Sequence, residues 1–326
     1  MKALQMSNYG VPQEVVELVD LPEPEAPRAD DVLAAVEYAP INHSEILKII
    51  RRYPLLPASL PAGVGNEGVA RILSVGRAVT GLKPGDRVIV PPTHSAWRER
   101  VVLPAAGLFA LPGGADPRQL SMLSINPPTA ALLLSEYVDL KPGEWVVQNA
   151  ANSGVGRWVI AFAKRRGLKT VNIVRRPELV PELEAIGGDL VVVDSPDISE
   201  RIKTAVGQAE LRLALDGVSG PATGVLAATL SPRGTLVSFA AMSSNPMSIS
   251  PLDVIFKPVT VRGFFMAHPE FAAKLAPAAA QAAEMIASGR MHIPVTATYP
   301  LSSIKEAVAH AERGGKILLD IAGSST

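Results

Sequence analysis

The sequence predicts an α/β protein in which a parallel-sheet domain is inserted into an irregular β-barrel domain. Three features of the 326-residue chain lead to this prediction. Residues 1–117 carry short apolar runs between proline- and glycine-rich turns. Residues 118–266 alternate apolar strands with helical stretches, and the tail ends in one more helix and strand. We therefore predict one β-rich domain from residues 1–117 and 267–326, and a second domain from residues 118–266.

The N-terminal region is interpreted as a barrel because its strand candidates are short, β-prone and separated by turns such as the one at residues 83–86. One helical piece, around residues 44–51, interrupts them. The strand candidates are Val15–Val19, Asp31–Val36, Gly68–Leu73, Asp86–Val90 and Glu99–Leu103.

The central region carries near-continuous apolar strands separated by helices, a pattern typical of a parallel sheet covered on both faces. An alanine-rich stretch over residues 270–289 then predicts a long helix. Residues 304–321 predict a final helix and strand, which we expect to return to the first domain. The strand candidates are Trp145–Val147, Thr170–Val174, Leu190–Val193, Leu211–Leu215, Thr235–Phe239 and Thr260–Phe264.

A strand, a glycine-containing turn and a helix follow one another between residues 144 and 167. In the G-x-G-x-x-G frame of dinucleotide-binding turns, Ala151 and Ser153 replace the first two glycines and Gly156 keeps the third. The N-terminus of the following helix would offer free N–H groups and a positive dipole end to a pyrophosphate. Because the turn lies between a buried strand and an amphipathic helix, we interpret it as a nucleotide-binding site rather than an ordinary connection.

Arg175 and Arg176 follow the second strand, where an NAD-binding domain usually carries an acidic residue for the ribose 2′-OH. The segment has no carboxylate before Glu178. Two guanidinium groups suit a 2′-phosphate through bidentate, charge-assisted hydrogen bonds. We therefore predict NADPH rather than NADH as the cofactor, the alternative being that the arginines only form a solvated helix start.

Composition excludes several classes of function. Lys+Arg and Asp+Glu both number 31, which argues against a general nucleic-acid or membrane surface. The chain has no cysteine, which excludes disulfides, thiolate catalysis and cysteine-ligated zinc. No apolar run is long enough to span a bilayer, and we recognise no signal or transit peptide, so we expect a cytoplasmic protein.

Short sequence elements along nearly the whole chain carry a family resemblance. They are Pro40-Ile-Asn42, Leu55-Leu-Pro57, Gly65-Asn-Glu-Gly68, Gly81-Leu-Lys-Pro-Gly-Asp86, Trp97-Arg98, Asn126-Pro-Pro-Thr129, Asn152-Ser-Gly-Val-Gly156, Asn172-Ile-Val-Arg175 and Arg262-Gly-Phe264. With these elements the chain resembles the medium-chain dehydrogenase/reductase superfamily, most of all its mitochondrial-type 2-enoyl thioester reductases and next its NADPH:quinone oxidoreductases. The resemblance implies a Rossmann-type NADP(H)-binding domain inserted in a chaperonin-10-like β-barrel that carries the substrate site.

The resemblance also implies which residues contact NADPH. The segments after the strands that end near residues 239 and 264 are supported independently, because nucleotides lie at the carboxyl ends of strands in such sheets. The predicted contacts are Asn42, Asn126, Thr129, Asn152, Ser153, Gly154, Val155, Arg175, Arg176, Phe239, Ala240, Ala241, Met242, Phe264, Phe265, Met266 and Lys316.

Reduction of a 2-enoyl thioester adds a hydride at C3 and a proton at C2, so the site needs a proton donor. A tyrosine hydroxyl, with an ordinary pKa of about 10, is protonated at neutral pH and can act as that acid. The family's acid is a tyrosine in a Gly-Asn-Tyr-Gly context before Leu-Leu-Pro. The resemblance therefore assigns this role to Tyr53, although its neighbours here are Arg52 and Pro54, which leaves the substrate open.

The resemblance implies that no metal is bound. Zinc-using relatives carry cysteine ligands and a Gly-His-Glu element, whereas this chain has no cysteine and carries Gly65-Asn66-Glu67. We expect Trp97 to form a wall of the substrate pocket, the alternative being a core residue. His43 stands where the family usually shows proline, next to the expected pocket.

A basic run precedes Tyr53. In a helical continuation Lys48, Arg51 and Arg52 are three and four residues apart and share a face. That face would meet a substrate carboxylate or the phosphates of a CoA or carrier-protein arm, unless it is only a solvated charged surface.

The sequence as a whole predicts an NADPH-dependent enzyme that reduces the C=C bond of a small-molecule substrate, a 2-enoyl thioester. Two alternatives on the same scaffold are a quinone or small-enone reductase and a reductase of a free α,β-unsaturated acid. A third alternative is a catalytically silent NADPH-binding protein. The apolar run Val259–Phe265, expected to be the last strand of the sheet, predicts a homodimer joined through the nucleotide-binding domains.

Overall fold

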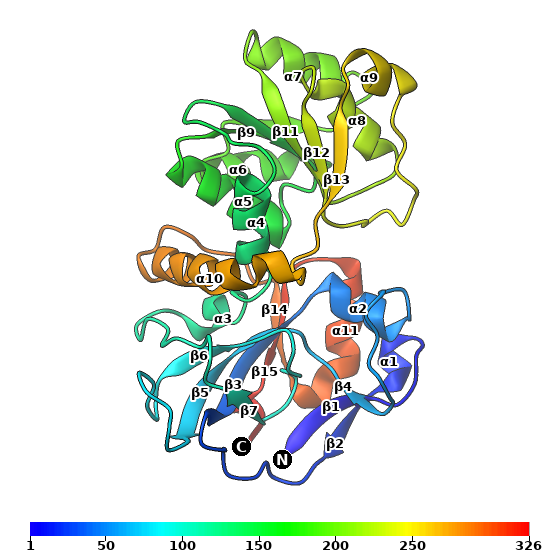
Figure 1. Cartoon of the computed structure of the whole chain (residues 1–326). Helices are drawn as coiled ribbons and strands as arrows, with labels where there is room; N and C mark the ends of the chain where they lie inside the picture. Colours follow the sequence, from blue (N-terminus) through cyan, green and yellow to red (C-terminus); the bar gives the residue numbers. More distant parts are fainter. Residues whose placement is uncertain (326) are drawn as a thin grey trace. The chain divides into compact units, whose positions relative to one another are not determined.

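The computed structural model describes residues 1–325 and divides the chain into two compact units (Figure 1). The first unit contains Met1–Ile125 and the chain from Leu275 onward, and the second contains Asn126–Lys274. The second unit therefore interrupts the first in sequence. Its boundaries lie a few residues after those expected at 118 and 266. No helix among the described residues is long and apolar enough to cross a membrane.

The second unit is built on a parallel six-stranded sheet with the strand order β10-β9-β8-β11-β12-β13. Its first strand in sequence, β8, has β9 on one side and β11 on the other, so the strand order reverses there. Ligands in open α/β sheets bind at this switch point, outside the carboxyl ends of the strands. The strands are β8 (Trp145–Gln148), β9 (Lys169–Val174), β10 (Leu190–Val193), β11 (Leu211–Asp216), β12 (Thr235–Ser238) and β13 (Thr260–Gly263).

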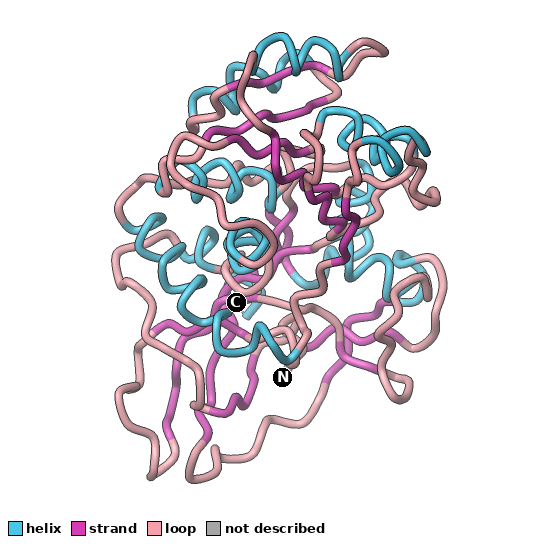
Figure 2. The backbone as a smooth tube through the Cα atoms, turned by 45° about the horizontal axis from the view of Figure 1, so that its top comes forward, coloured by secondary structure: helices cyan, strands magenta, loops and turns pink. Residues whose placement is uncertain are grey.

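Helices cover both faces of this sheet, as the near-continuous apolar strands predict (Figures 1 and 2). One apolar cluster joins the strands to Ile160 of α5 and Leu183 of α6. The other joins them to Ile198 of α7 and Leu226 of α8. The helices are α4 (Asn126–Ser135), α5 (Gly154–Arg165), α6 (Val180–Ala185), α7 (Ile198–Val206), α8 (Pro221–Thr229) and α9 (Pro251–Phe256).

The first unit contains two sheets. One has the order β14-β15-β3-β5-β6, with β7 also paired to β3, and the other has the order β2-β1-β4. The strands are β1 (Lys2–Met6), β2 (Val16–Asp20), β3 (Asp31–Ile41), β4 (Ala62–Gly63), β5 (Gly68–Val75), β6 (Arg87–Val90), β7 (Arg100–Pro104), β14 (Ala297–Pro300) and β15 (Ile317–Asp320). The helices are α1 (Pro12–Val15), α2 (His43–Ile49), α3 (Pro117–Leu120) and α11 (Ile304–Arg313), together with α10 (Ala272–Ala287) from Leu275 onward.

The C-terminal strand β15 has a direct consequence for the polar residues of the first unit. It pairs antiparallel with β3, and the register places Ile317 opposite Ile41. The residues next to this pair, Lys316 and Asn42, are thereby brought together from opposite ends of the chain. Short 3-10 turns complete the fold at Pro177–Leu179, Pro269–Phe271, Leu301–Ser303 and Ala322–Ser325.

Candidate active site

The turn before α5 is stabilised by a side-chain cap and leaves little room for side chains at its glycines. Ser153 is the N-cap of α5, and its Oγ accepts a hydrogen bond from the Gly156 N–H at 3.1 Å. A Cβ atom at Gly156 would lie 2.5 Å from the Ala151 carbonyl oxygen, and one at Gly154 would lie 2.6 Å from Asn126 Nδ2. The turn therefore requires glycine at position 156, where the close atoms belong to the backbone, and the side chain of Asn126 of α4 lies against Gly154 at the start of the helix.

The buried side chain of Gln148, the last residue of β8, fixes this turn to the sheet. Its Nε2 donates to the Gly156 carbonyl at 3.0 Å and to Asn172 Oδ1 at 2.8 Å. The turn is thus tied to both β8 and β9 where their carboxyl ends meet.

Asp216, the last residue of β11, connects the neighbouring loop and was not predicted from the sequence. Its carboxylate is fully buried, and Oδ1 accepts hydrogen bonds from Asn149 Nδ2 at 2.7 Å and from the N–H groups of Val218 and Ser219 at 2.9 Å. Oδ2 accepts from Thr223 Oγ1 at 2.6 Å. Asp216 therefore joins the loops after β8 and β11, the two strands at which the order of the sheet reverses.

Arg175 and Arg176 lie exposed directly after β9. Arg176 forms a long contact of 3.6 Å with the exposed Glu178, and such surface pairs contribute little stability. Arg175 makes no ion pair with any described residue. Both guanidinium groups are accessible to a phosphate.

The remaining predicted cofactor residues of the second unit follow β12 and β13 or belong to α4. Phe239 is half-buried and residues 240–242 are exposed. Thr129 is buried and its hydroxyl donates to the sulfur of Met266 at 3.8 Å, while the ring of Phe264 packs 5.3 Å from that of Phe271. The side chains of Thr129 and Phe264 thus make contacts with other residues of the second unit. These features suit a phosphorylated dinucleotide. The tight turn and the N-terminus of α5 suit its pyrophosphate, and the exposed arginines suit a further phosphate.

In the first unit, Asn42 is the centre of a polar cluster. Its Nδ2 donates to Glu67 Oε1 at 2.8 Å, and its Oδ1 accepts from Lys316 Nζ at 2.8 Å. Asn42 follows β3, Glu67 precedes β5 and Lys316 precedes β15, so the pairing of three strands assembles the cluster.

Glu67 is fully buried, and its second oxygen accepts from the N–H groups of Ser124 and Ile125, each at 3.2 Å. Burial raises the pKa of Glu67 to about 7, although Lys316 and Asn42 oppose this shift. Burial also lowers the pKa of Lys316. Burial thus disfavours the charged form of both groups, while their mutual attraction opposes it.

A second buried carboxylate, Glu45, lies in the first turn of α2. It accepts hydrogen bonds from the N–H groups of Asn42 and Asn66, both at 2.9 Å, and burial raises its pKa. Glu45 thus links the cluster around Asn42 to Asn66. Within the described residues, no group of three or more histidine, cysteine, aspartate or glutamate side chains is placed to hold a metal ion.

Tyr53 lies half-buried in the segment after α2. Burial and then the Glu45 carboxylate raise the pKa of the Tyr53 hydroxyl above its ordinary value. The hydroxyl is therefore protonated throughout the physiological range, as a proton donor must be.

The chain is similar in sequence and structure to known oxidoreductases. Residues 28–113 match the alcohol dehydrogenase GroES-like domain, and residues 154–282 match the zinc-binding dehydrogenase family. The mitochondrial enoyl-[acyl-carrier-protein] reductase of Rattus norvegicus is 38% identical over 276 residues, which are 82% of this chain and 73% of the rat protein. The chain belongs to the medium-chain dehydrogenase/reductase superfamily, in the mitochondrial-type enoyl reductase family.

Solved structures cover nearly the whole chain of this enoyl reductase family member. The complex of Etr1p with NADP and crotonyl-CoA is 25% identical, with a TM-score of 0.87 over 98% of this chain and 99% of that chain. The Escherichia coli quinone oxidoreductase complexed with NADPH is also 25% identical, with a TM-score of 0.85 over 98% of this chain and 100% of that chain.

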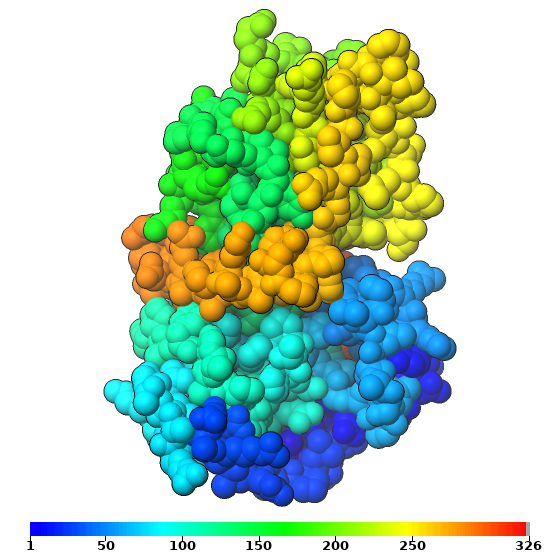
Figure 3. All heavy atoms as spheres, in the orientation of Figure 1, coloured from blue at the N-terminus to red at the C-terminus, as the bar shows by residue number. Residues whose placement is uncertain are grey.

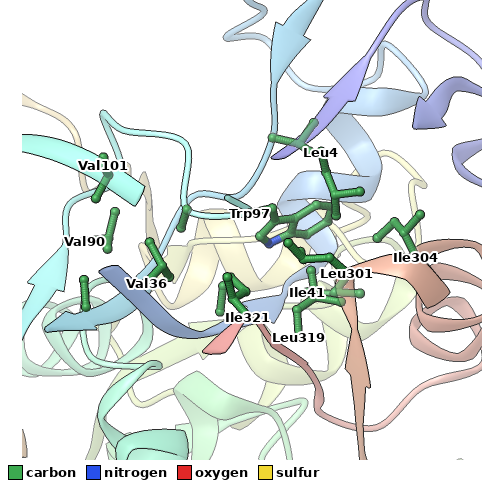
Figure 4. Close-up of a cluster of buried hydrophobic side chains, with 14 of the residues drawn as sticks. Leu4, Val36, Ile41, Val90, Trp97, Val101, Leu301, Ile304, Leu319 and Ile321 are labelled. Carbon is green, nitrogen blue, oxygen red and sulfur yellow. The ribbon is translucent and has the colours of Figure 1, made fainter. Parts of the chain in front are cut away.

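The structure corrects the expectation for Trp97. This side chain has no exposed area, and it packs in the hydrophobic core of the first unit among residues that include Leu4, Ile41 and Leu301 (Figure 4). Its Nε1 donates to the Pro40 carbonyl at 3.2 Å. In this member of the enoyl reductase family Trp97 is a core residue and does not present a surface to a pocket.

The structure also corrects the helical continuation expected for the basic run before Tyr53. The helix α2 ends at Ile49, and Arg51 adopts a left-handed backbone with φ of 57°. The Arg51 guanidinium lies 5.3 Å from the centre of the Tyr9 ring, whereas Lys48 Nζ lies 5.5 Å from the centre of the Tyr53 ring. Lys48 and Arg51 therefore do not share a face. Arg51, Arg52 and His43 are exposed, and their contact with substrate stays a prediction.

Proposed function

We propose that the protein is an NADPH-dependent reductase of the C=C bond of 2-enoyl thioesters. The observation that carries the proposal is Tyr53, a protonated hydroxyl in the β-rich unit of a chain that belongs to the enoyl reductase family. The likeness to the Etr1p complex with NADP and crotonyl-CoA supports the same cofactor and class of substrate.

The chain's own residues supply binding and proton transfer. The N-terminus of α5 and the turn at 152–156 bind the pyrophosphate, and Arg175 and Arg176 bind the 2′-phosphate. When bound, NADPH supplies the hydride that is added at C3 of the substrate. Tyr53 gives its proton to C2: the phenolic O–H bond breaks, a C–H bond forms, and the O–H electron pair stays on the phenolate oxygen.

An NADPH oxidation assay tests the proposal. The substrates are crotonyl-CoA, a quinone, a small enone and an acrylate-type acid, and we expect the highest kcat/KM for crotonyl-CoA. The quinone is the second candidate because the Escherichia coli quinone oxidoreductase has a similar fold. A preference for the quinone or the free acid would overturn the assignment of substrate. NADPH binding without oxidation by any of the four would favour a non-catalytic role.

The two arginines after β9 lead to a prediction about cofactor preference. NADPH should bind more tightly than NADH, and the double variant Arg175→Ala/Arg176→Ala should lose about ten- to a hundredfold in NADPH affinity because charged hydrogen bonds to the 2′-phosphate are lost. Affinity for NADH should stay unchanged. Titration of protein fluorescence with each nucleotide gives the four Kd values.

Arg165→Ala is the matched control, because Arg165 is an exposed arginine at the other end of α5. It should leave both affinities unchanged. Equal wild-type Kd values for NADPH and NADH would refute the preference.

The edge strand β13 supports a homodimer. All four of its residues are exposed, although strands of parallel sheets are normally buried on both faces. The preceding helix α9 also exposes large apolar side chains, with Ile255 at 65% and Phe256 at 73%. Figure 3 shows this segment, in yellow to orange, at the surface of the second unit. A bare apolar edge is an aggregation hazard, which pairing with a second copy removes.

We therefore expect a dimer mass by light scattering at micromolar concentration. Val261→Lys, which places a charge on the exposed face of β13, should shift the protein to monomer because burying an unpaired charge is unfavourable. The control Leu73→Lys changes an exposed leucine of the first unit and should stay dimeric. A monomeric wild-type protein would contradict the proposal.

A further inference from the structure

Lys48 is held beside the ring of Tyr53 by a chain of hydrogen bonds. Its Nζ donates to Asn66 Oδ1 at 2.7 Å and lies 5.5 Å from the centre of the Tyr53 ring. The Asn66 N–H in turn donates to the buried Glu45. The ammonium therefore has a fixed place, determined by the buried part of α2.

The surroundings of Tyr53 oppose the charge that it acquires when it gives up a proton. The Glu45 carboxylate disfavours a phenolate because the two negative charges repel each other. Partial burial disfavours it further, because it removes water from the ionised oxygen.

The other charged groups of this part of the first unit interact with groups other than Tyr53. Glu67 and Lys316 are both bound to Asn42. The Arg51 guanidinium lies over Tyr9. Lys48 is thus the cation that the described contacts place at the Tyr53 ring. Burial lowers the pKa of its ammonium, and the Glu45 carboxylate opposes this shift.

We propose that Lys48 is a positioning residue for Tyr53: its ammonium holds the ring and stabilises the phenolate that remains when the Tyr53 proton passes to C2 of the substrate. This inference rests on the proposed function. The proton returns to the phenolate oxygen from water after the product has left, so Lys48 itself is neither consumed nor changed.

Ionisation of Tyr53 can be measured without any substrate. The phenolate absorbance of the protein is titrated with pH, and subtraction of the Tyr53→Phe curve separates Tyr53 from the other tyrosines among the five in the chain. Lys48→Met and Lys48→Gln remove the charge, and the second keeps a donor for Asn66. Both should leave the Tyr53 midpoint near that of the wild type, because burial lowers the pKa of Lys48 and raises that of Tyr53, so Lys48 has lost its charge by the time Tyr53 ionises at alkaline pH. This titration therefore checks that the surroundings of Tyr53 are intact in each variant.

Lys48→Arg keeps a positive charge at the pH where Tyr53 ionises and should therefore lower the midpoint. Lys305→Met removes one exposed charge of α11 and should have no effect. A wild-type rate of crotonyl-CoA reduction in Lys48→Gln, or an unmoved Tyr53 midpoint in Lys48→Arg, with the protein folded by circular dichroism, would overturn the inference.

Single-turnover reduction of crotonyl-CoA gives the second measurement. The neutral variants should slow this step by about ten- to a hundredfold with KM unchanged, and Lys48→Arg should restore most of the rate. The two failures are distinguishable. No reduction of any substrate by the wild type refutes the proposed function, whereas a wild-type rate of reduction in the neutral Lys48 variants refutes only the role of Lys48.

Discussion

Replacing Tyr53 with phenylalanine should lower kcat for crotonyl-CoA reduction by about 10²- to 10⁴-fold, because the variant keeps the ring but loses the proton donor. The Kd for NADPH should stay at the wild-type value, since the predicted nucleotide contacts do not include this hydroxyl. Stopped-flow kinetics and a separate NADPH titration measure the two quantities.

Tyr9→Phe is a matched control in the same unit. It removes the same atom from a half-buried tyrosine whose hydroxyl makes no hydrogen bond with a described residue, so kcat should stay near the wild-type value. If Tyr53→Phe keeps near-wild-type kcat on every accepted substrate, another donor must act. His43 or a bound water molecule would then be the next to test.

Most of the fold was predictable because its signals are local. Each of the predicted strands of the second unit overlaps one that the structure shows, since parallel strands carry apolar runs that stand out between helices. In the first unit β14 was missed, because Ala297–Pro300 is half-exposed and has no apolar run. The end of α2 was also missed, because neither glycine nor proline marks Arg51, where the backbone turns left-handed.

The site was predictable only in part, and the reason is distance along the chain. The turn at 152–156 and the arginines after β9 belong to one strand–turn–helix–strand unit and are close in sequence. The contact between Asn42 and Lys316, in contrast, spans 274 residues and depends on the pairing of β15 with β3. A local pattern cannot reveal the resulting cluster with Glu67, although the N-x-x-E spacing from Asn42 to Glu45 does mark the start of α2. The prediction for Trp97 failed for a different reason. A resemblance to a family suggests a role for this position but does not say whether its large aromatic side chain is buried.

The other large expected effect concerns Asp216, whose replacement by alanine should reduce the free energy of unfolding of the second unit by about 3–5 kcal/mol. The variant removes the acceptor of four hydrogen bonds and leaves their donors, which include the Asn149 amide and the Thr223 hydroxyl, without a partner. Urea denaturation followed by the fluorescence of Trp145 and Trp158, both in this unit, measures the loss.

Asp216→Asn separates the hydrogen bonds from the charge. Its Oδ1 can still accept from Asn149, Val218 and Ser219, while its Nδ2 can donate to the Thr223 oxygen, so the cost should be only about 1–2 kcal/mol. NADPH affinity should fall with stability in Asp216→Ala, because the loops after β8 and β11 lose their common anchor at the switch point of the sheet. If the free energy of unfolding of Asp216→Ala were within about 1 kcal/mol of the wild-type value, this account would be wrong. A loss of stability with unchanged NADPH affinity would show that Asp216 supports the fold without positioning the nucleotide site.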